Sequence, residues 1–167
     1  MAFWYKASAA AAGTDQLIGQ YAVGDGFFLY ATSSGNLQFV VDGDTSLVNH
    51  QYAGGFISDG NWHHVAAIRS GNDFQMFVDG VGNTATTATV GTVTSTEPLE
   101  IGGSDGSDFE GKMDDVRVYT RALSSADVTE LFATGSTPQT YTVTNTLDAG
   151  AGSLRQAIIN ALSLIHI

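Results

Sequence analysis

The chain lacks cysteine and holds only two prolines and six basic residues among its 167 residues. Without cysteine it has no disulfide framework, no thiolate metal site and no cysteine nucleophile. Acidic residues outnumber basic ones 17 to 6, giving a formal net charge of −11, so the surface repels nucleic acid and anionic lipid. No run approaches the ~20 apolar residues of a transmembrane helix, and the first residues do not read as a signal peptide.

Short apolar and aromatic runs follow one another at regular spacing, separated by Gly, Asn, Asp and Ser. This pattern is typical of an antiparallel β-sandwich or barrel. Turn residues such as Asp42-Gly43 and Asp79-Gly80 predict hairpins directly after two of the runs. The segment 84–94 reads as an edge strand. The predicted strands are 3–5, 16–23, 27–31, 37–41, 62–69, 74–78, 99–101 and 116–119.

One short helix is predicted near the end of this region. Ser124 and Asp127 have the spacing of an N-cap and its acidic partner. Val128, Leu131 and Phe132 then fall on one face, and we expect Gly135 to end the helix. A helix this short must pack against a sheet.

The composition changes after Gly135, which predicts a division of the chain. We expect a β-sandwich over residues 1–135 and a linker over 136–140. The roughly 30 residues beyond the linker are too few for an independent core. There Ser153, with Gln156 three residues on, predicts the start of a second helix.

Four motifs in register carry a family resemblance. They are Gly60-Asn61-Trp62-His63-His64-Val65-Ala66-Ala67, Phe74-Gln75-Met76-Phe77-Val78-Asp79-Gly80, Leu99-Glu100-Ile101-Gly102-Gly103, and Gly111-Lys112-Met113-Asp114-Asp115-Val116-Arg117-Val118-Tyr119 with the Thr120-Arg121-Ala122-Leu123-Ser124 that follows. Together they resemble laminin-G-like jelly-roll domains of the concanavalin A-like lectin/glucanase superfamily, over roughly residues 2 to 134. The resemblance implies an all-β fold, an antiparallel jelly-roll sandwich with one short C-terminal helix.

The resemblance also implies a departure at the start of the chain. Family members begin with one or two strands ahead of the segment that matches Phe3-Trp4-Tyr5-Lys6, and those strands pair with the closing strand. We therefore expect this copy to lack its N-terminal edge strand. A missing edge strand would leave backbone groups unpaired and create a tendency to associate.

A second resemblance lies in residues 141–158. Tyr141-Thr142-Val143-Thr144 and the segment Gly152-Ser153-Leu154-Arg155-Gln156 are similar to the opening strand and capping helix of right-handed parallel β-helices in bacterial surface proteins. We interpret 141–161 as the truncated start of such a domain, and 162–167 as a non-native tail. The parent is then expected to be a longer secreted or cell-surface protein.

The Trp62-His63-His64 cluster is the first candidate for a metal site. Neighbouring strand residues point to opposite faces of a sheet, so His63 and His64 cannot readily share one metal. The favoured interpretation is that Trp62 packs in the core while both histidines form local hydrogen bonds. His50 alone carries no signal either.

An acidic loop is the better candidate for a metal. Asp105, Asp108, Glu110, Asp114 and Asp115 lie within eleven residues, and oxygen ligands of this kind suit Ca²⁺. From the residues alone a solvated acidic turn is the favoured interpretation, because charge runs usually form solvated faces. Many relatives carry a structural calcium, so the resemblance favours Ca²⁺, with Asp114 and then Asp115 as its expected ligands.

Two tyrosines are candidate platforms for a sugar ring, namely Tyr30 and Tyr52, the latter in a segment that reads as a loop. Both could equally be ordinary surface tyrosines. No catalytic pair is evident: Glu97 and Glu100 stand three apart and so fall on opposite faces of a strand, unlike the paired carboxylates of retaining glycosidases. We therefore expect no enzyme activity.

The resulting hypothesis is a non-catalytic extracellular recognition module that binds carbohydrate or a surface protein, with calcium as its expected cofactor. Two alternatives stay open. The sandwich could be a structural spacer or folding cap in an adhesin without a ligand of its own. It could also be the accessory binding module of a polysaccharide-degrading β-helix enzyme.

Overall fold

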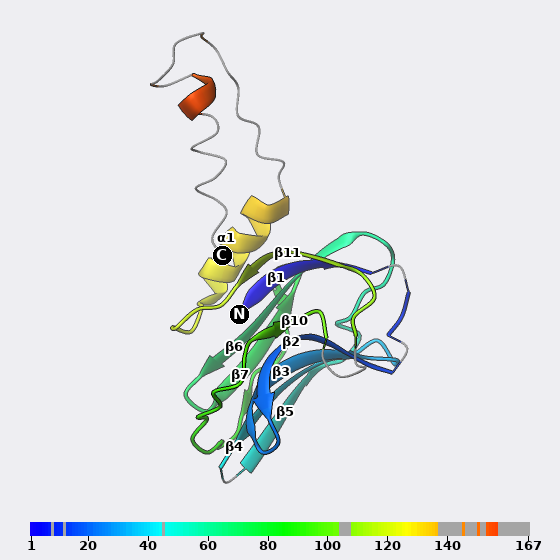
Figure 1. Ribbon diagram of the computed structural model, residues 1–167, viewed down its shortest axis with the longest axis vertical. Coiled ribbons are helices and arrows are strands. Elements are labelled where there is room, and N and C mark those ends of the chain that lie inside the picture. Colours follow the sequence, from blue (N-terminus) through cyan, green and yellow to red (C-terminus); the bar gives the residue numbers. More distant parts are fainter. Residues whose placement is uncertain are drawn as a thin grey trace.

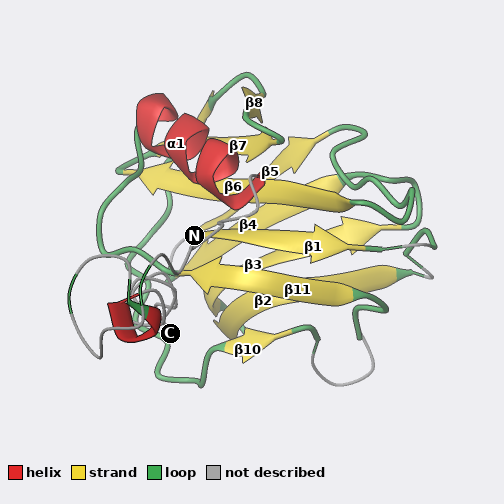
Figure 2. Cartoon of the chain, turned by 90° about the horizontal axis from the view of Figure 1, so that it is seen from above, coloured by secondary structure: helices red, strands yellow, loops and turns green. Residues whose placement is uncertain are grey.

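A six-stranded and a five-stranded antiparallel β-sheet face each other, and one helix packs on the outside of the six-stranded sheet (Figures 1 and 2). The computed structural model describes residues 1–7, 9–11, 13–44, 46–103, 108–136, 145, 150 and 153–156. The predicted jelly-roll-type sandwich is confirmed. Most of the predicted linker, β-helix segment and tail lies outside the described residues, so the division after Gly135 stays a prediction. In the described part of the β-helix segment, the Gln156 backbone N–H donates to Ser153 Oγ (3.2 Å), as expected of an N-cap.

The six-stranded sheet joins the two ends of the sandwich sequence, because its first strand pairs with its last described strand. Ala2 lies opposite Arg117 in one pairing and opposite Ala66 in the other. The order is β11 (Lys112–Arg117), β1 (Ala2–Lys6), β6 (Trp62–Ser70), β7 (Asp73–Val78) and β8 (Val81–Gly82), with β9 (Thr86–Thr87) also pairing with β7. Among the described strands β11 is an edge of this sheet, and the expected lack of an N-terminal edge strand stays a prediction.

The second sheet is a meander closed by a strand from later in the chain. Its order is β10 (Glu100–Ile101), β2 (Thr14–Ala22), β3 (Asp25–Thr32), β4 (Leu37–Gly43) and β5 (Ser46–Tyr52). Both predicted hairpins are present, but the first turns later than predicted, because Asp42 and Gly43 still pair with Leu47 and Ser46 as part of β4. The turn between β7 and β8 places Asp79 and Gly80 at φ 48° and 78°, the left-handed conformation that a two-residue hairpin requires.

Three strand predictions need correction. β5 covers Asn49–Tyr52, which the sequence indicated to be loop, because its polar side chains hid the alternation. The closing strand begins at Lys112 rather than Val116 and ends at Arg117. Within residues 84–94 only Thr86–Thr87 pairs as a strand.

The core lies between the sheets and is built from the inward-facing residues of both. Along β6, Val65 and Ala67 face this core, while Ala66 and Ile68 face the helix. The largest fully buried side chains are those of Tyr5, Phe3, Phe74, Leu17, Ile18, Leu29, Leu37, Met76 and Val65 from the sheets and Val128 from the helix. The alternation of β6 thus supplies two apolar layers, one on each side of the six-stranded sheet.

Helix α1 (Ser125–Ser136) covers the outer face of the six-stranded sheet (Figure 2). The predicted cap is confirmed, since the Ser124 backbone N–H donates to Asp127 Oδ2 (2.7 Å) and the Asp127 N–H donates to Ser124 Oγ (3.2 Å). Gly135 does not end the helix. It lies inside the last turn, where a Cβ would stand 2.2 Å from Trp4 Nε1, so the glycine permits the close approach of helix and sheet.

Candidate functional site

A row of aromatic side chains runs across the outer face of the five-stranded sheet. Alternation puts Phe28 and Tyr30 of β3 on this face, because Phe27, Leu29 and Ala31 pack against the core. The Phe28 ring meets that of Tyr21 edge-on at 4.8 Å between centroids, and stacks with that of Tyr30 at 5.5 Å. All three rings are half-buried, so each keeps part of its surface exposed.

Glycine beside the aromatic row leaves its centre open. Gly19 of β2 pairs with Phe28, and a Cβ at Gly19 would lie 2.7 Å from the Phe28 Cβ. The neighbour of Tyr21 on β3 is Gly26, which in turn pairs with Asp42 of β4. With no side chain at Gly26, the Tyr21 hydroxyl donates to Asp42 Oδ2 (3.1 Å) across the intervening strand.

Amide and carboxylate groups flank the rings. Tyr30 Oη donates to Gln38 Oε1, which also accepts from Asn49 Nδ2 (2.7 Å). Gln16 Nε2 donates to Glu100 Oε2 at the other side of the sheet (3.4 Å). These contacts orient hydrogen-bonding groups of four strands around one apolar stripe. The arrangement can pack a flat molecule against the rings and bind its polar edges.

The charge of this face has one sign. None of the five strands of the sheet contains lysine or arginine, whereas Asp42 and Glu100 lie on its outer face. The face therefore repels anionic ligands and does not repel neutral ones.

The two predicted tyrosine platforms separate in the structure. Tyr30 belongs to the aromatic row. Tyr52 packs against the core and its hydroxyl donates to the Val81 carbonyl (3.3 Å), so it does not belong to the face. Tyr21, Phe28 and Gln38 were not singled out from the sequence, although the register of β2 to β4 is what brings them together.

His63 forms local hydrogen bonds, as expected, but the buried His64 Nδ1 has no hydrogen-bond partner among the described residues. Trp62 does not lie in the core: it is 41% exposed, on the outer face of β6. His50 is buried, with Nδ1 2.9 Å from Thr86 Oγ1 and Nε2 3.2 Å from Asn83 Oδ1.

Two carboxylates bracket His63. Its Nδ1 lies 2.7 Å from Asp79 Oδ2 and its Nε2 lies 3.0 Å from Asp59 Oδ1. Burial is the largest influence and lowers the pKa of His63, but the hydrogen bonds to Asp79 and Asp59 outweigh it, so the pKa is raised overall. The hydrogen bond between His63 and Asp59 also lowers the pKa of Asp59, to about 2. The cluster ties the loop before β6 to the turn after β7.

His64 on the opposite face has different surroundings. Its ring lies 5.3 Å from that of Trp4 and 6.2 Å from that of Phe132 on α1. Burial lowers its pKa to about 4, with Asp79 and Asp115 acting against the shift and Arg117 adding to it.

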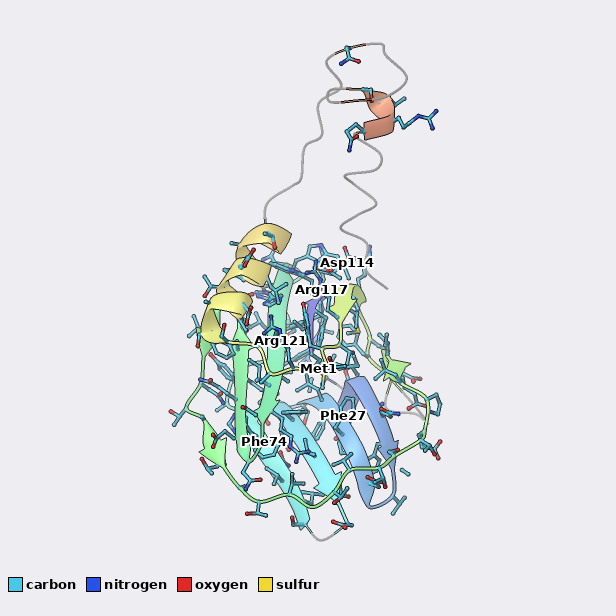
Figure 3. All side chains as sticks on the ribbon, turned by 90° about the vertical axis from the view of Figure 1, so that its left-hand side faces the viewer. Met1, Phe27, Phe74, Asp114, Arg117 and Arg121 are labelled. Atoms are coloured by element: carbon cyan, nitrogen blue, oxygen red, sulfur yellow. The ribbon has the colours of Figure 1, made fainter. Side chains whose placement is uncertain are left out.

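The expected calcium ligands lie on β11. Asp114 Oδ1 accepts from the Asp115 N–H (2.8 Å), and Asp115 Oδ1 accepts from Arg117 Nε (2.7 Å). Figure 3 shows Asp114 and Arg117 close to each other in the upper part of the sandwich. Among the described residues no group of three or more His, Asp or Glu side chains is placed to hold a metal ion. Calcium binding through Asp114 and Asp115 therefore stays a prediction.

The sequence profile of the Laminin_G_3 family, described as the concanavalin A-like lectin/glucanases superfamily, matches residues 1–129. A search of curated protein sequences found no significant match.

Solved structures share the fold at low sequence identity. Domains LG4-5 of the mouse laminin alpha1 chain are 18% identical with a TM-score of 0.59, over 73% of this chain and 35% of that one. The Ruminococcus gnavus IT-sialidase CBM40 bound to α2,3 sialyllactose is 15% identical with a TM-score of 0.64, over 78% and 80%. Domain 4 of AbnA, a GH43 extracellular arabinanase from Geobacillus stearothermophilus in complex with arabinotriose, is 20% identical with a TM-score of 0.64, over 78% and 64%. This chain thus spans about a third of the laminin LG4-5 structure. Of its described helices, none has the length and apolar character needed to cross a bilayer.

Proposed function

This chain belongs to the concanavalin A-like lectin/glucanases superfamily, and on that basis we propose that it is a non-catalytic carbohydrate-binding module of an extracellular protein. The glycan would lie across the outer face of the five-stranded sheet. The aromatic row of Tyr21, Phe28 and Tyr30, flanked by amides and carboxylates, is the observation that carries the proposal.

The chemistry of the face fits a sugar. The C–H faces of a pyranose or furanose ring are apolar and pack on aromatic rings, while its hydroxyl groups donate to and accept from amides and carboxylates. Gln38 lies beside Tyr30 and is held there by two donors, so little side-chain entropy is lost when a ligand binds. Two structural neighbours that hold sialyllactose and arabinotriose support a glycan at the level of the fold.

We further propose that the glycan is neutral. Because the face lacks basic residues and carries Asp42 and Glu100, a sialic or uronic acid would meet repulsion without a compensating ion pair. Uncharged oligosaccharides, of which arabinotriose is an example, meet no such penalty.

Replacing Tyr30 by alanine tests this proposal. On a glycan array the wild-type protein is expected to bind neutral rather than acidic oligosaccharides. Titration calorimetry with the strongest neutral ligand is then expected to show at least a tenfold loss for Tyr30→Ala, about 1.4 kcal/mol, from the lost stacking surface. Tyr30→Phe keeps the ring and isolates the contribution of the bond to Gln38.

The matched control is Trp62→Ala, which removes an exposed aromatic from the other sheet. Its affinity is expected to equal that of the wild type, with thermal unfolding confirming that both variants are folded. Equal losses in the two variants, or binding confined to acidic glycans, would contradict the proposed face. No binding to any glycan would favour the alternatives of a protein ligand or a spacer within a longer adhesin.

Calcium is a separate proposal, with Asp114 and Asp115 as its ligands. A ligand at a hundred times its dissociation constant stabilises the folded state by about 2.7 kcal/mol. The melting temperature is therefore expected to rise by several degrees in millimolar Ca²⁺ relative to chelator, and Asp114→Asn is expected to abolish that rise. Magnesium at the same concentration controls for general charge screening. A melting temperature that is the same in Ca²⁺ and in chelator would contradict the calcium site, and Asp115 would then serve only to bind Arg117.

A further inference from the structure

A cavity of about 250 Å³ opens between the two sheets, away from the outer face proposed for glycan. Phe27, Phe39 and Val41 line it from the five-stranded sheet, while Ala67 and Arg69 line it from β6. The connection from β11 to α1 closes another side with Arg121 and its neighbours. Figure 3 shows Met1, Phe27 and Arg121 grouped at this place.

The alternation of side chains along β6 places an arginine at this cavity. Val65 and Ala67 face the core, so Arg69, two residues further, is the next residue on the inner face. Its guanidinium carbon lies 5.8 Å from the centroid of the Phe74 ring, and its Nε donates to the Gly71 carbonyl (3.0 Å). These two contacts fix the stem and the orientation of the guanidinium group.

Arg69 has no carboxylate partner among the described residues, although the chain carries 17 acidic residues and only six basic ones. Arg121, which also lines the cavity, is engaged differently: both of its terminal nitrogens donate to Asp127, at 2.9 and 3.0 Å. The Met1 ammonium, which also lines the cavity, donates to the Ala67 carbonyl (2.9 Å). The terminal nitrogens of Arg69 make no hydrogen bond to a described residue, so both can donate to an anion.

We propose that this cavity binds a small amphipathic carboxylate, with its alkyl or aryl tail between the sheets and its carboxylate on Arg69. The apolar lining gains free energy by covering the tail, and the planar guanidinium suits a carboxylate. The volume lies just below the range of about 300–1,000 Å³ typical of drug-sized ligands, which limits the tail to a short one. In so acidic a protein an anionic ligand needs a cation, and the Arg69 guanidinium supplies it in this cavity.

Octanoate and 1-octanol form a probe pair with the same tail and different head groups. By titration calorimetry the wild-type chain is expected to bind both, and octanoate more tightly. Arg69→Gln is expected to weaken octanoate at least tenfold and to leave 1-octanol unchanged. Lys112→Gln, which removes one exposed positive charge elsewhere, is the control and is expected to leave both affinities unchanged.

A second variant tests the location. Val93 lines the cavity from a connecting segment, so Val93→Phe is expected to fill the space without disturbing a strand and to weaken both probes. Octanoate bound equally by wild type and Arg69→Gln would overturn the role of Arg69. Failure of the folded wild-type chain to bind either probe, or full binding by Val93→Phe, would overturn the cavity as the site. The glycan proposal rests on other residues and is unaffected by either result.

Discussion

Replacing Gly26 by alanine is expected to destabilise the protein by about 3 kcal/mol, through overpacking and an unfavourable backbone conformation together. Gly26 has φ 137°, and a Cβ there would stand 2.2 Å from the Gln20 carbonyl oxygen and 2.7 Å from the Tyr21 Cα. Both contacts are with backbone of the partner strand, which cannot move aside without opening the β2–β3 hairpin. Thermal or urea unfolding measures the loss.

Gly24 in the same hairpin is the matched control. It also has a positive φ, 83°, but a Cβ there would meet nothing within 4 Å. Gly24→Ala should therefore cost only the backbone strain, about 1 kcal/mol. Because Tyr21 reaches Asp42 across Gly26, the Gly26 variant is also expected to lose glycan affinity, whereas the Gly24 variant keeps it. Equal destabilisation by the two substitutions would show that the close contact at Gly26 is relieved cheaply.

The same hairpin shows what the sequence could predict and what it could not. The predicted strands 16–23 and 27–31 leave residues 24–26 as a turn, which is correct for Gly24 but not for Asp25 and Gly26, which begin β3. The sequence did not show that the missing side chain of Gly26 lets Tyr21 of β2 reach Asp42 of β4. That role depends on register, which only the pairing of the strands reveals.

The candidate face was hidden for a related reason. Residues 27–31 of β3 are apolar or aromatic at every position, so alternation alone does not tell which side faces the core. The two neighbouring strands decide it, placing Phe28 and Tyr30 outside. Strand β5 was missed because its inward-facing residues include His50, which is buried yet fully hydrogen-bonded. By contrast, the β6 motif predicted correctly that His63 and His64 lie on opposite faces.

His64 is expected to make the fold sensitive to acid between pH 6.5 and pH 4. Its pKa is about 4 in the folded protein and about 6.5 when unfolded, chiefly because burial between Trp4 and Phe132 disfavours the charged ring. Unfolding therefore takes up a proton in this range, and stability falls as the pH falls. The difference between the two pKa values amounts to about 3 kcal/mol at pH 4.

Substituting His64→Phe should remove this contribution. Among the described residues the buried Nδ1 of His64 has no hydrogen-bond partner, so phenylalanine removes an unsatisfied polar atom while still packing against Trp4 and Phe132. Unfolding free energies measured by urea at pH 7 and pH 4.5 are expected to fall less for His64→Phe than for the wild type.

The bonds of His63 to Asp59 and Asp79 act in the opposite direction, because its raised pKa adds stability as the pH falls below that value. His63 is present in both proteins, so its contribution cancels when the two pH differences are compared. Phe132→Leu keeps the titratable group but loosens its burial, so this variant is expected to be less stable at pH 7 and to lose less further stability on acidification than the wild type. A His64→Phe protein that loses as much stability on acidification as the wild type would show that the acid response lies in the carboxylates rather than beneath α1.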